Sequence, residues 1–137
     1  MKKYLLDTNI CIYYLKRKFD LDKKVAQVGF DNCYVSEITL AELLFGVENG
    51  SEEHKERNQT KYEEFVELFE DRVIPIRDAF EQYAIHKAKL KKAGTPIGDF
   101  DTLIATSALV HDMILVTRNV KHFERIEGLK IENWIDE

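Results

Sequence analysis

The sequence has few residues that could cross-link it or bind a soft metal. Only two of its 137 residues are cysteines, Cys11 and Cys33, and they lie on separate apolar stretches without the spacing of a metal or redox pair. We therefore expect both thiols to be reduced and buried in the core. The four histidines show no close ligand spacing either, which argues against a zinc site.

Long apolar runs are also missing. No segment approaches the ~20 apolar residues that a membrane-spanning helix requires. The first apolar run ends at Asp7, before the core of a signal peptide could form. We therefore expect a cytoplasmic protein with no membrane association.

The chain has fewer basic residues than acidic ones. A net charge of −5 argues against a protein that coats nucleic acid through bulk attraction. Basic runs at residues 16–18, 87–92 and 118–125 could still line a groove, although each run is also typical of a solvated helix face.

The chain does contain short apolar runs that alternate with amphipathic segments. The expected strands are residues 4–6, 33–35, 73–76, 113–117 and 129–131, and the expected helices are residues 10–15, 21–28, 38–49, 51–71, 79–92, 97–110 and 120–125. No repeat or linker divides the chain. This alternation predicts one α/β domain spanning residues 1–137, a three-layer α/β/α sandwich around a mainly parallel sheet of four or five strands.

Acidic residues fall where such a sheet would place a functional site. Ligand crevices in open α/β sheets lie beyond the carboxyl ends of the strands. Asp7 directly follows the first strand, and Asp99, Asp101 and residues 117–119 follow later strands or begin helices. Asp7 could instead simply cap the helix that begins near Thr8.

Glu42 is the acid within the apolar stretch 40–45 of the third expected helix. On a helix it shares a face with Ile38 and Phe45, which favours an inward orientation, although a helical Glu is also typical of a solvated surface. Burying an unpaired carboxylate is costly, and a bound cation would remove that cost.

Asp99 and Asp101 cannot share a helix face, because they are two residues apart. Asp101 lies above the small residues Ala105 and Ala108, and Asp99 lies above a more polar face. This spacing predicts that Asp101 points toward Asp7. The alternative is that Asp101 only complements the helix dipole while Asp99 caps the helix.

A cluster of these acids indicates metal chemistry. Three carboxylates within ~5 Å would repel one another by roughly 1–4 kcal/mol per pair, so such a cluster does not serve stability. Mg²⁺ prefers a few carboxylates together with water and phosphate oxygens, and it supports hydrolysis of a phosphodiester. The chain has no glycine-rich phosphate loop, which disfavours hydrolysis of a nucleoside triphosphate.

Four blocks resemble the signature segments of PIN-domain ribonucleases, and more closely those of VapC toxins. They are residues 5–10, 36–43, 96–105 and 116–119, the last followed by Phe123. The resemblance implies an endoribonuclease dependent on Mg²⁺ or Mn²⁺, forming a homodimer and inhibited by a VapB-type antitoxin.

Carried over by position, the resemblance makes Asp7, Glu42 and Asp101 metal ligands and catalytic residues. Asn119 takes the place of a fourth acid found in many relatives, which puts tight binding of a second metal in doubt. Asn9, Thr117 and Asp99 become accessory residues. Relatives often carry Pro in place of Asp99.

Two other functions fit parts of the pattern. A PIN-fold binding protein that has lost catalysis would explain Asn119. A receiver-like signalling domain also binds Mg²⁺ at strand ends, but it requires adjacent acids, whereas Asp7 stands alone. Tyr62, Phe65 and Phe69 form an aromatic stripe that could serve a homodimer interface or the core.

Overall fold

The fold is built on a five-stranded parallel sheet. The computed structural model describes residues 1–136, so Glu137, the last residue of the predicted domain, lies outside the described residues. The strands are β1 (Tyr4–Leu6), β2 (Cys33–Ser36), β3 (Val73–Ile74), β4 (Ile114–Val116) and β5 (Ile131–Glu132). Their order across the sheet is β3-β2-β1-β4-β5, and every neighbouring pair is parallel.

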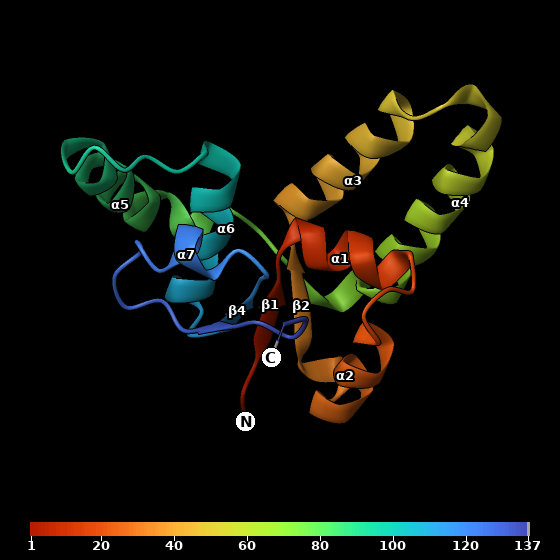
Figure 1. Cartoon of the computed structure of the whole chain (residues 1–137), viewed down its shortest axis with the longest axis horizontal. Coiled ribbons are helices and arrows are strands. Elements are labelled where there is room, and N and C mark those ends of the chain that lie inside the picture. Colours follow the sequence, from red (N-terminus) through yellow and green to blue (C-terminus); the bar gives the residue numbers. More distant parts are fainter. Residues whose placement is uncertain (137) are drawn as a thin grey trace.

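Helices connect the strands and cover both faces of the sheet. They are α1 (Thr8–Leu15), α2 (Leu21–Val28), α3 (Glu37–Asn49), α4 (Glu52–Leu68), α5 (Phe80–Lys92), α6 (Asp99–Val110) and α7 (Val120–Phe123). Helices α1 to α4 lie on one side of the sheet and α5 to α7 on the other (Figure 1). This arrangement confirms the predicted three-layer sandwich.

Each strand side chain belongs to one of two cores. Tyr4 and Leu6 pack with residues of α1, α2 and α4, whereas Leu5 packs with residues of α5 and α6. All three residues are buried, which explains why β1 is continuously apolar rather than alternating.

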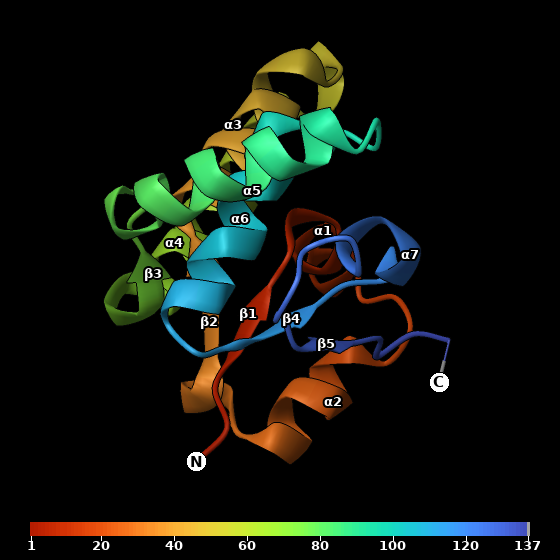
Figure 2. The same ribbon diagram turned by 90° about the vertical axis from the view of Figure 1, so that its left-hand side faces the viewer.

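Strand β1 occupies the centre of the sheet (Figure 2). Tyr4 pairs with Cys33 of β2 on one side and with Ile114 of β4 on the other. The chain leaves β1 toward β2 and reaches β4 only later, so the strand order reverses between β1 and β4. A crevice is expected at such a reversal, beyond the carboxyl ends of these two strands.

Two of the three residues of the predicted aromatic stripe lie in the core, and the third, Tyr62, is partly buried against it. Phe65 is 2% exposed and Phe69, in the turn after α4, is fully buried, with their ring centroids 4.8 Å apart. These two rings are therefore unavailable for a homodimer interface. Pro75 follows the edge strand β3 directly, where a residue that cannot donate a ladder hydrogen bond is tolerated.

The cysteines are free and buried, as predicted. Burial raises the pKa of the Cys33 thiol to about 11 and holds that of the Cys11 thiol well above its usual range. Within residues 1–136, no helix combines the length and apolarity needed to span a membrane.

Candidate active site

Asp7 joins the central strand to the first helix. Its carboxylate caps α1, since Oδ1 accepts a hydrogen bond of 2.8 Å from the backbone N–H of Ile10. Its own backbone N–H donates to the carbonyl oxygen of Val116 at 3.1 Å, which ties the ends of β1 and β4 together. The side chain is only 6% exposed. Asp7 is therefore both the N-cap of α1 and a residue of the crevice beyond β1 and β4.

The environment of Asp7 disfavours its negative charge. Its pKa is raised from 3.8 to about 6, mainly by burial and further by the charges of Asp101 and Glu42. Hydrogen bonds from the Thr117 hydroxyl and the Ile10 N–H act in the opposite direction. The three predicted acids thus interact, and a cation at this position would relieve the repulsion.

Glu42 reaches the crevice from α3. Ser36, the last residue of β2, caps α3 by accepting a hydrogen bond from the backbone N–H of Ile38 at 3.0 Å. One turn further along the helix, Glu42 Oε1 accepts a hydrogen bond of 2.6 Å from Thr8, the first residue of α1. This bond fixes the partly buried carboxylate of Glu42 against Thr8, the residue that follows Asp7 in the sequence.

The predicted reason for the orientation of Glu42 was partly wrong. Ile38 is buried, but Phe45 is 67% exposed, so it does not draw the Glu42 face inward. The contact with Thr8, whose hydroxyl also lies 2.9 Å from that of Thr39, accounts for the position instead. A polar contact between two helices is not visible in helical spacing.

Asp101 and Asp99 point to different neighbours. Asp101 Oδ2 lies 3.3 Å from Nε2 of His122 on α7, and the charge of Asp101 acts on Asp7. Asp99 Oδ1 lies 2.8 Å from both Nζ of Lys87 and the donating hydroxyl of Tyr83 on α5. The separation follows the predicted spacing, since Ala105 and Ala108 on the Asp101 side are fully buried.

Two details of this helix differ from the prediction. Gly98, not Asp99, occupies the N-cap position of α6. The face beneath Asp99 is also buried, because the hydroxyls of Thr102 and Thr106 donate to backbone carbonyls of the preceding turn at 2.8 Å and 2.7 Å. Polar side chains that donate hydrogen bonds to the backbone of their own helix can be buried without leaving a polar group unpaired.

The remaining predicted residues surround a small hollow at the end of β4. This hollow has a volume of about 280 Å³ and is lined by Asp7, Asn9, Tyr13, Thr117, Arg118 and Asn119. Thr117 is fully buried, and its hydroxyl accepts a hydrogen bond of 3.1 Å from the backbone N–H of Asn119. The lining of the hollow, as far as the described residues show, does not include Glu42 or Asp101.

The acids do not form a ready-made metal cage. Within residues 1–136, no group of three His, Cys, Asp or Glu side chains converges closely enough to hold an ion. The donor chemistry nevertheless suits Mg²⁺ or Mn²⁺, which is bound through one or two carboxylates while it keeps several waters. The raised pKa of Asp7 fits this donor set, because a bound cation would offset both the effect of burial and the smaller effect of the Asp101 and Glu42 charges.

Three residues near these acids, His122, Thr8 and Tyr13, were not among the predicted site residues. His122 lies against Asp101, with its Nε2 inaccessible to solvent. Thr8 bonds to Glu42, and Tyr13 lines the hollow. Only the position of Thr8 beside Asp7 carried a signal in the sequence, since the other two depend on how helices pack.

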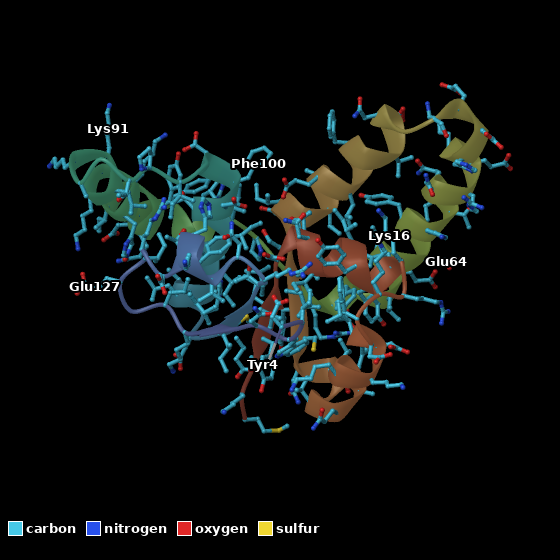
Figure 3. The ribbon with its side chains drawn as sticks, in the orientation of Figure 1. Tyr4, Lys16, Glu64, Lys91, Phe100 and Glu127 are labelled. Atoms are coloured by element: carbon cyan, nitrogen blue, oxygen red, sulfur yellow. The ribbon has the colours of Figure 1, made fainter. Side chains whose placement is uncertain are left out.

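One large apolar side chain, that of Phe100, is exposed beside Asp101 in the sequence. Figure 3 shows Phe100 projecting from the first turn of α6, where it separates Asp99 from Asp101 in sequence. It is 52% exposed, although a phenylalanine normally gains from burial.

Known proteins match almost the whole chain. Residues 4–129 match the PIN domain family. The tRNA(fMet)-specific endonuclease VapC of Salmonella typhimurium is 36% identical, over 98% of this chain and 99% of its own length. Ribonuclease VapC2 of Haemophilus influenzae is 39% identical, over 98% of this chain and its own full length.

Solved structures show the same relationship. The DNA-bound VapBC structure from Salmonella typhimurium aligns with a TM-score of 0.86 at 35% identity, covering 98% of this chain and 99% of the other. VapBC2 of Rickettsia felis, bound to a DNA fragment from its promoter, aligns with a TM-score of 0.83 at 34% identity and covers 96% and 98%. The chain therefore belongs to the PIN-domain family and, within it, to the VapC ribonucleases.

Proposed function

We propose that residues 1–137 form one catalytic domain that hydrolyses RNA phosphodiester bonds with Mg²⁺ or Mn²⁺, as the toxin of a toxin–antitoxin pair in the cytoplasm. The observation that carries this proposal is the buried Asp7, whose pKa is raised to about 6 by burial and by the charges of Asp101 and Glu42. A buried carboxylate at a strand end destabilises the fold when it is charged, and a bound cation would offset that cost.

The position of each residue indicates its role in the proposed reaction. Asp7, Glu42 and Asp101 would hold the ion, directly or through its bound waters, and the ion would supply charge neutralisation for the phosphate and activation of water. Thr117 orients Asp7 through its hydroxyl, and Asn119, which also lines the hollow, offers an amide to the RNA. Asp99 contributes only indirectly, because Lys87 and Tyr83 hold it against α5.

Cleavage of RNA by the purified protein tests the proposal. We expect cleavage with Mn²⁺ or Mg²⁺, none with EDTA, and none by Asp7→Asn. The tRNA(fMet) is the first substrate to try, because two of the similar proteins are named for it. Asp112→Asn is the matched control, since Asp112 is an exposed acid at the opposite end of β4. Full activity of folded Asp7→Asn would refute the assigned mechanism.

The same experiment separates the nuclease from a binding protein with a lost active site. Asn119 in place of an acid is the feature that favours such a protein. A folded wild-type protein that binds RNA but leaves it intact at saturating Mn²⁺ would support this second function.

We further propose a VapB-type antitoxin as the partner, with a basic side chain placed in the acidic crevice where it competes with the ion. The similar solved structures are VapBC complexes. Exposed aromatic residues, including Phe45, Phe80 and Phe100, offer apolar surface for a protein partner or for a homodimer. Expression of the chain alone should arrest growth, and co-expression of its antitoxin should restore it.

A homodimer is testable separately by light scattering. Phe45→Ser and Phe80→Ser keep the core intact, because both side chains are more than half exposed. We expect at least one of them to yield a monomer, and a monomeric wild type at tens of micromolar would exclude the dimer for the free protein.

A further inference from the structure

Arg118 lies at the rim of the hollow that contains Asp7. It directly follows the buried Thr117, and it lines the hollow together with Asn9, Tyr13 and Asn119. Its side chain is 44% exposed, so the guanidinium faces both the hollow and solvent. Asp7 and Arg118 are the two charged residues in this lining, one acid and one base.

Aromatic side chains hold the guanidinium in one orientation. The hydroxyl of Tyr13 accepts a hydrogen bond from Arg118, and the guanidinium stacks 5.0 Å from the ring centroid of Phe19. The rings of Phe19 and Tyr13 meet edge to face at 5.1 Å. An arginine fixed in this way presents its forked donors without a large loss of side-chain entropy, which suits a carboxylate or a phosphate.

A carboxylate of the same chain occupies this fork. Arg118 donates from Nε to Asp136 Oδ2 at 3.2 Å and from its Nη2 to Oδ1 at 3.3 Å. Asn133 also donates its amide to Asp136 Oδ2 at 3.0 Å. The two carboxylate oxygens thus stand where two oxygens of a phosphate group would be bound.

The pair is well placed to exchange partners. Both side chains are nearly half exposed, and exposed ion pairs contribute little stability. An RNA strand entering the hollow brings phosphate groups toward a protein with a net charge of −5. A second phosphate, next to the one at the proposed cation, needs a positive charge of its own, and Arg118 is the basic residue in the lining.

We propose that Arg118 binds a phosphodiester group of the RNA strand next to the one at Asp7, and that Asp136 of the C-terminal segment competes for the same guanidinium. This inference rests on the proposed nuclease function, because it adds a binding subsite to that active site. It makes the C-terminal segment an internal competitor of the substrate.

The test measures affinity rather than cleavage. All variants carry Asp7→Asn, and binding of a labelled single-stranded RNA is followed by fluorescence anisotropy at several salt concentrations. Arg118→Gln should weaken binding about fivefold and make the log–log salt dependence shallower by about 0.7, the value for one phosphate contact on a single strand. Arg118→Lys should keep the salt dependence and recover part of the affinity.

Asp136→Asn should have the opposite effect. Release of the competing carboxylate should tighten RNA binding by about twofold to threefold, as expected for one exposed ion pair. The gain should disappear in the Arg118→Gln background, because both residues act on the same contact.

Two control variants separate this contact from bulk charge. Arg125→Gln removes an exposed arginine outside the hollow. Asp112→Asn breaks an exposed ion pair with Lys130, 3.2 Å long, at the opposite end of β4. The proposal is overturned if Arg118→Gln weakens binding no more than Arg125→Gln, or if Asp136→Asn tightens it no more than Asp112→Asn.

Neutral linkages in the RNA locate the phosphate. Replacing one phosphodiester at a time with a methylphosphonate should reveal a position that lowers the affinity of the arginine-containing protein but not of Arg118→Gln. Absence of any such position would refute the subsite even if the wild type cleaves RNA.

The subsite and the nuclease function can fail independently. If the wild type cleaves no RNA, yet these binding effects are found, the nuclease function fails and the subsite stands. An effect of Arg118→Gln on antitoxin affinity alone would assign the residue to the protein partner and overturn the proposal.

Discussion

Neutralising Asp7 is expected to stabilise the protein while it removes activity. The folded-state pKa of about 6 lies roughly 2 units above the ordinary value of 3.8. At about 1.4 kcal/mol per unit, the charged form makes the fold about 3 kcal/mol less stable than it would be with an unperturbed carboxylate. Asn keeps the shape and can still cap α1 by accepting from the Ile10 N–H, so Asp7→Asn removes the charge alone.

The sign of the effect sets its pH dependence. Because the folded-state pKa is raised, protonation of Asp7 stabilises the fold fully below pH 3.8, and this stabilisation is lost as the pH rises through about 6. The Asn variant should therefore be about 3 kcal/mol more stable than wild type at pH 8 and equally stable near pH 3.5, provided both remain folded there.

Urea unfolding in EDTA measures this difference directly. The wild type and Asp7→Asn are compared from acid to pH 8, so that titrating groups remote from Asp7 cancel, and the interaction of Asp7 with Asp101 and Glu42 is part of the measured difference. Adding Mn²⁺ at pH 8 should then raise the stability of wild type and close much of the gap. A stability difference that is constant across the pH range would show that the charge of Asp7 does not destabilise the folded state.

Three further predictions address single contacts. Asp101→Asn should abolish RNA cleavage, whereas Asp99→Asn should lower it only modestly because its exposed partners are Lys87 and Tyr83; kinetics at saturating Mn²⁺ with matched melting temperatures compare the two. His122→Ala should raise the Mn²⁺ concentration needed for half-maximal cleavage, and His122→Gln should recover part of the loss if the residue orients Asp101 through a hydrogen bond. Phe65→Ala should lower the free energy of unfolding by about 3–5 kcal/mol without changing the specific activity of the folded fraction, as measured by denaturant titration beside an activity assay.

Local patterns predicted most of the fold. The central strands β1 and β4 could be located because their apolar side chains are buried on both faces of the sheet. Helices α2 and α3 could be located because Gly29 follows the first, and Ser36 and Gly50 flank the second. Helix ends were less certain, since α7 ends at Phe123 and not at Arg125.

The site was predictable only in outline. Strand order and helical spacing were enough to orient Asp7 and to separate Asp101 from Asp99. The contacts that fix these acids join different helices, as between Thr8 and Glu42 or between Asp101 and His122, and no spacing within one helix reveals them. The catalytic roles of these residues stay predictions.

The central place of β1 also has a consequence during synthesis. Its partner Cys33 leaves the ribosome early, but Ile114, its partner on the other side, is made only when most of the chain is complete. Asp7 therefore has no Val116 to bond with, and no Thr117 hydroxyl, until the last fifth of the chain has emerged. Contacts between such distant residues also form slowly. An unfinished chain that ends before β4 lacks the residues that bond to Asp7, so we expect the nascent chain to be inactive until β4 has emerged.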